Sequence, residues 1–129
     1  MTEKRLLQLA TGLACLVPLT VGGRSVIAGP EWIAHGAALP IDLDSHYRYL
    51  SGIFLGVGIA FATCIPAIER KGARFRLLGA LVIAGGLGRL VSLLAAGVPG
   101  TGHLFGLAME LGVVLLLLLW QRHVERAAR

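Results

Sequence analysis

The sequence predicts an all-α membrane protein, a four-helix transmembrane bundle that forms a single integral membrane domain. Of its 129 residues, 56% are hydrophobic and 15% are charged, whereas about a quarter of the residues of soluble domains are charged. The hydrophobic residues gather in four runs that are long enough to cross a bilayer. The predicted helices cover about residues 6–22, 46–68, 75–97 and 103–120.

The first run follows the basic pair Lys4 and Arg5 and contains Pro18, a residue that kinks helices. A charged start and an apolar run are also marks of a signal peptide, but the small-residue cleavage pattern is missing where it should fall. We therefore expect an uncleaved transmembrane helix.

The connection from Gly22 to Ser45 is rich in glycine, proline and acidic residues. Pro30 followed by Glu31 suits the first turn of a helix, so a short interfacial helix is expected over residues 30–37. Ser45 is the expected N-cap of the second transmembrane helix.

Basic residues are distributed unequally between the two predicted faces of the membrane. The N-terminus, the loop after the second helix and the C-terminal tail hold nine of the twelve Lys and Arg residues: two, four and three respectively. The positive-inside rule then places both termini in the cytoplasm, and the expected location is a bacterial inner membrane. Because these charges lie at the ends of apolar runs, we do not expect the protein to bind nucleic acid.

Two charged residues fall within predicted membrane-spanning helices at matching depths. Arg89 lies eight residues before Gly97, and Glu110 lies seven residues after His103. At 1.5 Å per residue these separations correspond to roughly 12 Å and 10 Å below the outer ends of the two helices. Since a short turn joins these helices, they should be antiparallel neighbours, and we expect Arg89 and Glu110 to pair. Such a pair is either a structural ion pair or part of a functional site.

Further polar residues are expected near the outer end of the bundle. Arg48, Ser92 and His103 are predicted to rim an outward-facing polar pocket whose floor is formed by Arg89 and Glu110. The glycines on the same faces are interpreted as helix-packing residues that let neighbouring backbones approach closely. They are Gly52, Gly56, Gly85, Gly88 and Gly106.

Three segments resemble a known family: HYRYLSGIFLGVGIAF, GLGRLVSLLAAGVPG and AMELGVVLLLLLW. They look like the small four-helix bacterial membrane proteins catalogued as domain of unknown function 4345. The family pattern has an aromatic-flanked arginine, a G-R-x-x-S element, a G-x-P turn and a glutamate in the last helix. In this sequence its features fall at the following residues: Arg48, Gly88, Arg89, Ser92, Gly97, Pro99 and Glu110. The resemblance covers about residues 45–120 and implies four helices, but it implies no activity.

Cysteine and histidine give weaker signals. Cys15 and Cys64 are expected at unequal depths in different helices, which argues against a disulfide. His35, His46 and His103 are a conceivable zinc site together with an acidic residue of the loop, but nothing fixes their spacing. We therefore expect no metal, and no motif indicates a cofactor or a catalytic residue.

Three functional hypotheses remain open from the sequence. The leading one is a non-enzymatic membrane protein that holds a small amphipathic or lipid-like ligand, or a partner subunit, in the polar pocket. The second is an integral-membrane enzyme that uses Glu110 or His103 for acid–base chemistry on a lipophilic substrate. The third is a proton-coupled transporter that forms a homo-oligomer through its glycine-rich faces.

Overall fold

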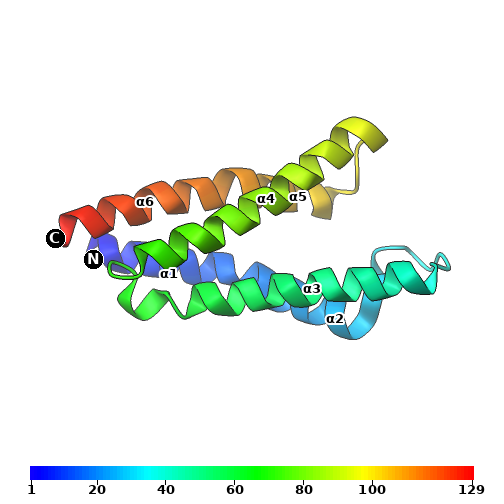
Figure 1. The fold of residues 1–129 in the computed structure, drawn as a ribbon, viewed down its shortest axis with the longest axis horizontal. Coiled ribbons are helices and arrows are strands. Elements are labelled where there is room, and N and C mark those ends of the chain that lie inside the picture. The colour runs from blue at the N-terminus through cyan, green and yellow to red at the C-terminus, as the bar shows by residue number, and fades with distance from the viewer. The chain divides into compact units, whose positions relative to one another are not determined.

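A computed structural model describes residues 1–129 and contains helices and no strands (Figure 1). Four helical stretches are long and apolar enough to cross a membrane: Glu3–Trp32, Ile41–Ala67, Gly72–Ala96 and Thr101–Ala127. The expected all-α fold with four membrane-spanning helices is thereby confirmed.

The chain divides into two compact units, each of which is described by itself. The α2–α3 unit comprises Leu9–Ile65, and the α4–α6 unit comprises Met1–Gln8 together with Pro66–Arg129. Helix α1 (Glu3–Val17) begins in the second of these units and continues into the first.

The α2–α3 unit is built around a proline. Because Pro18 has no backbone N–H, the helix cannot make its regular hydrogen bond there, and α1 passes into the π-helical turn η1 (Pro18–Gly22). Helix α2 (Gly23–Ala28) and the 3₁₀ turn η2 (Gly29–Trp32) extend the same stretch. Both η1 and α2 pack along α3 (Ile41–Ala62). A Cβ at Gly58 of α3 would lie 2.7 Å from the Pro18 ring, so this glycine makes room for the proline.

The first helical stretch is longer than predicted. It reaches Trp32 rather than residue 22, and the expected interfacial helix over residues 30–37 is replaced by η2 and a following turn. Two adjacent glycines, Gly22 and Gly23, were interpreted as a helix end. They stay helical because Gly22 packs against the Leu55 backbone, 3.0 Å from where a Cβ would stand.

Helix α3 begins earlier than predicted. Pro40 precedes its first residue, and Asp42 and Asp44 lie in its first turn, where negative charge stabilises the helix dipole. Ser45 lies inside the helix and is not its N-cap. The helix ends at Ala62, and the short 3₁₀ turn η3 (Ile65–Ala67) completes the apolar stretch.

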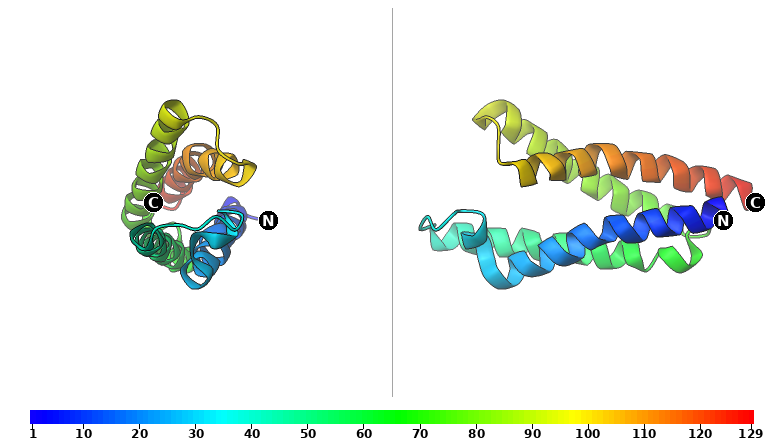
Figure 2. Two further views of the ribbon diagram at one scale, coloured as in Figure 1. Left: turned by 90° about the vertical axis from the view of Figure 1, so that its right-hand side faces the viewer. Right: turned by 180° about the vertical axis from the view of Figure 1, so that it is seen from behind.

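The α4–α6 unit is an antiparallel helical hairpin. Helix α4 (Gly72–Ala96) ends at Gly97, whose φ of 107° favours glycine, and the chain turns into α5 (Thr101–Ala108). The π-helical turn η4 (Met109–Val113) then leads into α6 (Val114–Ala127), and all three helical segments pack on α4. The two termini of the chain lie at the same end of this unit (Figure 2).

The last helix extends beyond the predicted end at residue 120 and includes most of the polar tail. Gln121 and Val124 are buried, and the Gln121 amide donates to the Ile68 carbonyl at 3.0 Å. The tail is therefore the amphipathic end of α6, and it packs against Ile68, near the start of the segment Pro66–Arg129.

The glycines that lie closest to neighbouring helices are different from those predicted. A Cβ would have no atom within 4 Å at Gly56, Gly85 or Gly88, and at Gly52 it would meet only a Val26 methyl at 3.9 Å. The glycines in close contact are Gly22, Gly29, Gly58, Gly72, Gly79 and Gly86. The spacing of glycines identifies a helix face with small residues, but it does not show which face packs against a neighbouring helix.

Candidate functional site: the Arg89 cluster

Arg89, Glu110 and His103 form one hydrogen-bonded cluster within the α4–α6 unit. The Arg89 Nε donates to Glu110 Oε2 at 3.0 Å, and Nη2 donates to Oε1 at 3.1 Å. The Arg89 Nη1 lies 3.0 Å from His103 Nδ1. Because an arginine can only donate, this histidine nitrogen is the acceptor. The pairing of Arg89 with Glu110 that equal depth predicts is thus present.

The π-helical turn η4 and one glycine bring Glu110 to α4. Gly86 lies three residues before Arg89, and a Cβ there would be 2.9 Å from the Glu110 Cβ. Glu110 is the second residue of η4 and is 7% exposed. The missing side chain at Gly86 therefore lets the two backbones approach until the carboxylate is buried against the guanidinium. Short π-helical insertions of this kind are frequent at functional sites.

Gly106 faces the guanidinium itself. A Cβ at this position would lie 3.5 Å from Arg89 Nε and Cζ, which is ordinary van der Waals contact. The prediction that Gly106 is a small residue on the polar face thus corresponds to a contact with Arg89 and not to helix–helix backbone packing.

Arg89 keeps hydrogen-bonding capacity that its neighbours do not use. A guanidinium has five N–H groups. Glu110 takes the Nε proton and one Nη2 proton, and His103 takes one Nη1 proton. One N–H on each terminal nitrogen remains, and the Arg89 side chain is 36% exposed although it lies within a membrane-spanning helix. A fixed arginine with two available donors can bind a carbonyl, carboxylate or phosphate oxygen.

Ser92 lies outside this cluster. It is exposed on α4, and no hydrogen bond joins its hydroxyl to Arg89, Glu110 or His103. Its predicted place on the rim of a pocket is not supported by any contact within its unit.

Arg48 has separate partners in the α2–α3 unit. Its Nε donates to Asp44 Oδ2 at 2.9 Å, and its Nη1 donates to the carbonyls of Val26 and Ile27 at 2.7 and 2.8 Å. These carbonyls belong to the last turn of α2, which has no intrahelical donors for them. Arg48 therefore caps the end of α2.

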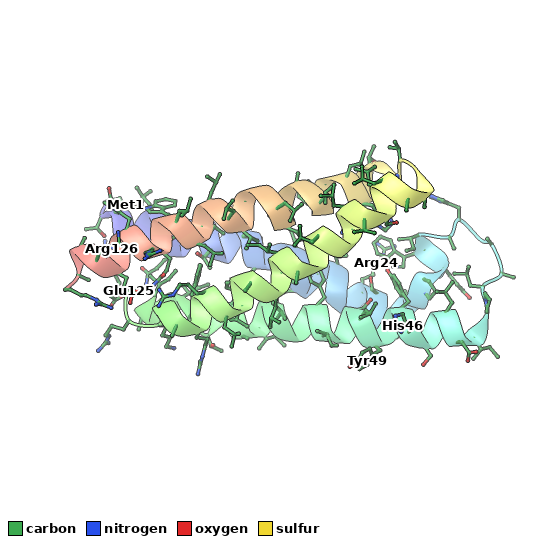
Figure 3. The ribbon with its side chains drawn as sticks, turned by 45° about the horizontal axis from the view of Figure 1, so that its top comes forward. Met1, Arg24, His46, Tyr49, Glu125 and Arg126 are labelled. Atoms are coloured by element: carbon green, nitrogen blue, oxygen red, sulfur yellow. The ribbon has the colours of Figure 1, made fainter.

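Aromatic and hydroxyl groups complete this end of the α2–α3 unit. The Arg24 guanidinium, labelled in Figure 3, lies 4.7 Å from the centroid of the Trp32 ring, a cation–π distance. The hydroxyls of Ser25 and Tyr47 are 2.9 Å apart. The sequence reasoning missed all of these contacts, because it ended the first helix before Arg24.

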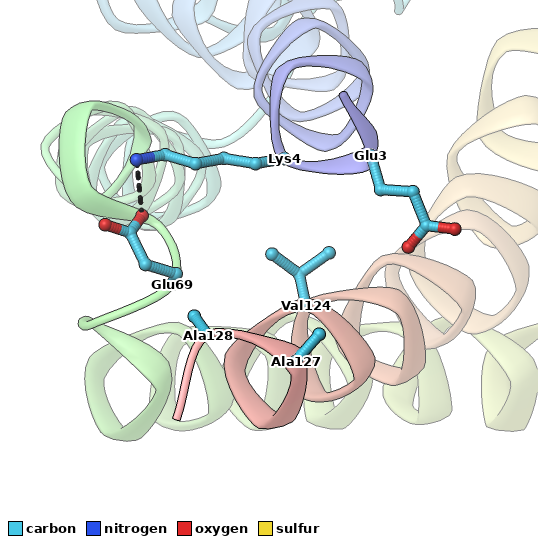
Figure 4. Close-up of a pocket in the computed structure, with 6 residues that line it drawn as sticks. All are labelled: Glu3, Lys4, Glu69, Val124, Ala127 and Ala128. Carbon is cyan, nitrogen blue, oxygen red and sulfur yellow. Dashed lines mark ion pairs between the residues drawn. The ribbon is translucent and has the colours of Figure 1, made fainter. Parts of the chain in front are cut away.

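Neither of two hollows on the protein surface includes a predicted site residue. One, of about 360 Å³, lies in the loop of the α2–α3 unit: Pro30, Glu31, Gly36, Ala37, Ala38, Leu39 and Asp44. The other, of about 200 Å³, lies at the end of the α4–α6 unit: Glu3, Lys4, Glu69, Val124, Ala127 and Ala128 (Figure 4). No group of three or more His, Cys, Asp or Glu side chains is placed to hold a metal ion.

Comparison with known families identifies the chain. A family model described as a domain of unknown function, DUF4345, matches residues 6–121. The chain belongs to the DUF4345 family. The match confirms the resemblance noted in the sequence and extends it over the first helix, and it includes Arg48, Arg89 and Glu110. Neither a curated protein nor a solved structure matches this DUF4345 chain.

Proposed function

We propose that this DUF4345 protein binds the polar head of a small amphipathic or lipid-like molecule at Arg89, within the membrane and without catalysing a reaction on it. The observation that supports the proposal is the pair of unused N–H groups on a guanidinium that Glu110 and His103 hold in place. In hydrocarbon, an unpaired donor costs free energy, so an acceptor from a ligand would be favoured there.

The surroundings of the cluster fit an amphipathic ligand. On α4 the positions on the same face as Arg89, three and four residues away, carry small or aliphatic side chains: Gly85, Gly86, Ser92 and Leu93. A lipophilic chain can lie on such a surface while its polar head accepts from Nη1 and Nη2. Glu110 neutralises the charge of Arg89, so the site suits a neutral carbonyl as well as an acid.

Native mass spectrometry of the protein in mild detergent tests the proposal. We expect the wild-type protein and the control variant Arg24→Gln to retain a lipophilic molecule. We expect Arg89→Gln/Glu110→Gln to lose it, because the amide pair can keep the helices together without the guanidinium donors. The proposal is wrong if the folded double variant, or a stable Arg89→Leu variant, retains the same molecule, or if the wild-type protein carries and binds none.

We also infer that the protein lies in a bacterial inner membrane with both termini in the cytoplasm. The support is the excess of basic residues at one end of the α4–α6 unit, where both termini lie. A green fluorescent protein fused to the C-terminus should fluoresce, and alkaline phosphatase fused there should be inactive. The reverse pair of results would place the C-terminus outside.

A further inference from the structure

The α4–α6 unit has one end with a large excess of positive charge, which we call the basic end. It joins the first residues of α1, the start of α4 and the end of α6. Its basic residues are Lys4, Arg5, Arg70, Lys71, Arg74, Arg76, Arg122, Arg126 and Arg129. Its acidic residues are Glu3, Glu69 and Glu125, so the formal excess is six charges: nine basic against three acidic residues with histidine neutral.

Ion pairs hold the three segments of the basic end together. Lys4 of α1 lies 3.1 Å from Glu69, which precedes α4 (Figure 4). The Arg76 Nη1 of α4 donates to Glu125 Oε2 of α6 at 2.7 Å. His123 of α6 also lies 3.3 Å from Glu3 of α1, a contact that is an ion pair only when the imidazole is protonated. The basic residues are therefore assembled on one surface by tertiary contacts and are not merely close to one another in sequence.

The two central acidic residues point inward and their basic partners point outward. The side chains of Glu69 and Glu125 are each 15% exposed. Their partners are much more exposed: Lys4 42%, Arg76 45%, Arg129 78% and Arg70 81%. The mostly buried carboxylates thus hold the exposed arginines and lysine in position by ion pairs. The outer surface of the basic end is therefore positively charged.

Glycine at the start of α4 makes this inward position possible for Glu125. A Cβ at Gly72 would collide with the Glu125 carboxylate and with the Arg76 guanidinium. The carboxylate consequently lies over the first turn of α4, where the helix has unpaired N–H groups and a positive dipole end. A larger residue at Gly72 would push the negative charge toward the surface.

From this arrangement we propose that the basic end binds the phosphate headgroups of anionic phospholipids. The surface lies where membrane-spanning helices begin and end: Gly72 opens α4, and Arg122 follows Trp120 by two residues. Headgroup phosphates lie at that level, and basic residues at the membrane surface attract anionic lipids. Arg5, Arg122 and Arg126 pair with none of the acidic residues of this end, so their guanidinium groups are available to phosphate oxygens.

The test is native mass spectrometry of the full-length protein titrated with two lipids that have the same acyl chains, phosphatidylglycerol and phosphatidylcholine. The wild-type protein should bind phosphatidylglycerol more tightly. Since each basic residue near the surface contributes about fivefold in affinity, Arg5→Gln/Arg122→Gln/Arg126→Gln should reduce the preference by at least about tenfold. Raising the salt concentration should weaken it as well.

Three controls make the result decisive. Arg5→Lys/Arg122→Lys/Arg126→Lys retains the charges and should retain most of the preference. Arg24→Gln removes a charge at the far end of the first helical stretch and should have no effect. Gly72→Ala should weaken phosphatidylglycerol binding, because it displaces Glu125 toward the surface.

The proposal fails if the wild-type protein binds both lipids equally, or if the folded triple glutamine variant keeps the preference. These variants differ from those that test Arg89, so the two proposals can fail independently.

Discussion

Arg48 and Arg89 are both arginines within membrane-spanning helices, yet their side chains have opposite kinds of partner. Arg48 donates to two main-chain carbonyls and to Asp44, which lies on its own helix. Arg89 donates only to side chains, those of Glu110 in η4 and His103 in α5. The first arginine completes a helix end, whereas the second is one member of a polar cluster.

The number of unused donors separates the two sites further. Arg48 makes bonds to four acceptor atoms and has one N–H left, whereas Arg89 has two, one on each terminal nitrogen. Two donors on one guanidinium can bind both oxygens of a carboxylate or phosphate, whereas a single donor cannot. The comparison therefore favours Arg89, and not Arg48, as the ligand-binding residue.

The two arginines should differ most in the unfolding free energy that is lost when the arginine is replaced and in how much of it returns when its carboxylate partner is replaced as well. Arg89→Leu leaves the carboxylate of Glu110 buried and unpaired, which should cost about 3–5 kcal/mol of unfolding free energy. Arg89→Leu/Glu110→Leu should recover most of this loss. Denaturant unfolding in detergent measures both variants, and failure of the second substitution to recover stability would show that the pair is not an isolated ion pair.

Arg48→Leu should cost less unfolding free energy than Arg89→Leu: it removes the donor from the carbonyls of Val26 and Ile27, but Arg48 is 40% exposed and water can replace part of what is lost. The same unfolding experiment should show no recovery in Arg48→Leu/Asp44→Leu, since the second substitution does nothing for the carbonyls. Recovery there would mean that Arg48 acts through its ion pair, like Arg89, and the contrast between the sites would disappear.

The glycines beside the two arginines should differ in the same sense. Gly29 has φ 70° and ψ −165°, a conformation that essentially only glycine adopts, and a Cβ there would lie 2.8 Å from Asp44 Oδ1. Gly29→Ala should therefore destabilise by about 1–2 kcal/mol. Gly106→Ala, which makes only an ordinary contact with Arg89, should be neutral or slightly stabilising in thermal unfolding. Equal losses at the two positions would contradict this difference in backbone conformation and contact.

The ion pair of Glu69 has the smallest expected effect. Burial alone would raise the pKa of Glu69, but hydrogen bonds from its backbone and from Lys4, and the charges of Lys4 and Arg70, hold the pKa below its usual value. The stabilisation is therefore present at neutral pH and is lost as the pH falls through the lowered pKa.

Because Lys4 is 42% exposed, we expect less than about 1 kcal/mol from this pair. Unfolding measured from pH ~7 to ~3 should show a shallower loss of stability in Glu69→Gln than in the wild-type protein. An identical pH profile for the two proteins would exclude a stabilising role for the pair.

The sequence predicted the Arg89–Glu110 pair because a short turn and the fixed helical rise determine which residues lie level across a hairpin. It could not predict the π-helical turn that carries Glu110, since no composition signal distinguishes Met109–Val113 from regular helix. It also selected Gly85 and Gly88 although Gly86 is the residue in contact. On a helix, one position changes direction by about 100°, so small errors in face assignment exchange buried for exposed glycines.

The other errors share a cause: residues that often end helices were interpreted without their tertiary partners. Gly22 and Gly23 stay helical because α3 packs closely on this turn, and Asp42 and Asp44 open a helix because negative charge is stabilising there. Because the predicted first helix ends at residue 22, the sequence predicts no helix end near Arg48 whose carbonyls could accept its hydrogen bonds. Arg48 was consequently assigned to the pocket and not to a helix end.

The most direct test of the central claim compares the two arginines in ligand binding. The amount of lipophilic molecule that co-purifies per protein should be unchanged in Arg48→Gln and lost in Arg89→Gln/Glu110→Gln, when both variants are folded and measured by native mass spectrometry in the same detergent. Loss of the molecule in Arg48→Gln together with its retention in the Arg89 variant would contradict the assignment of the site.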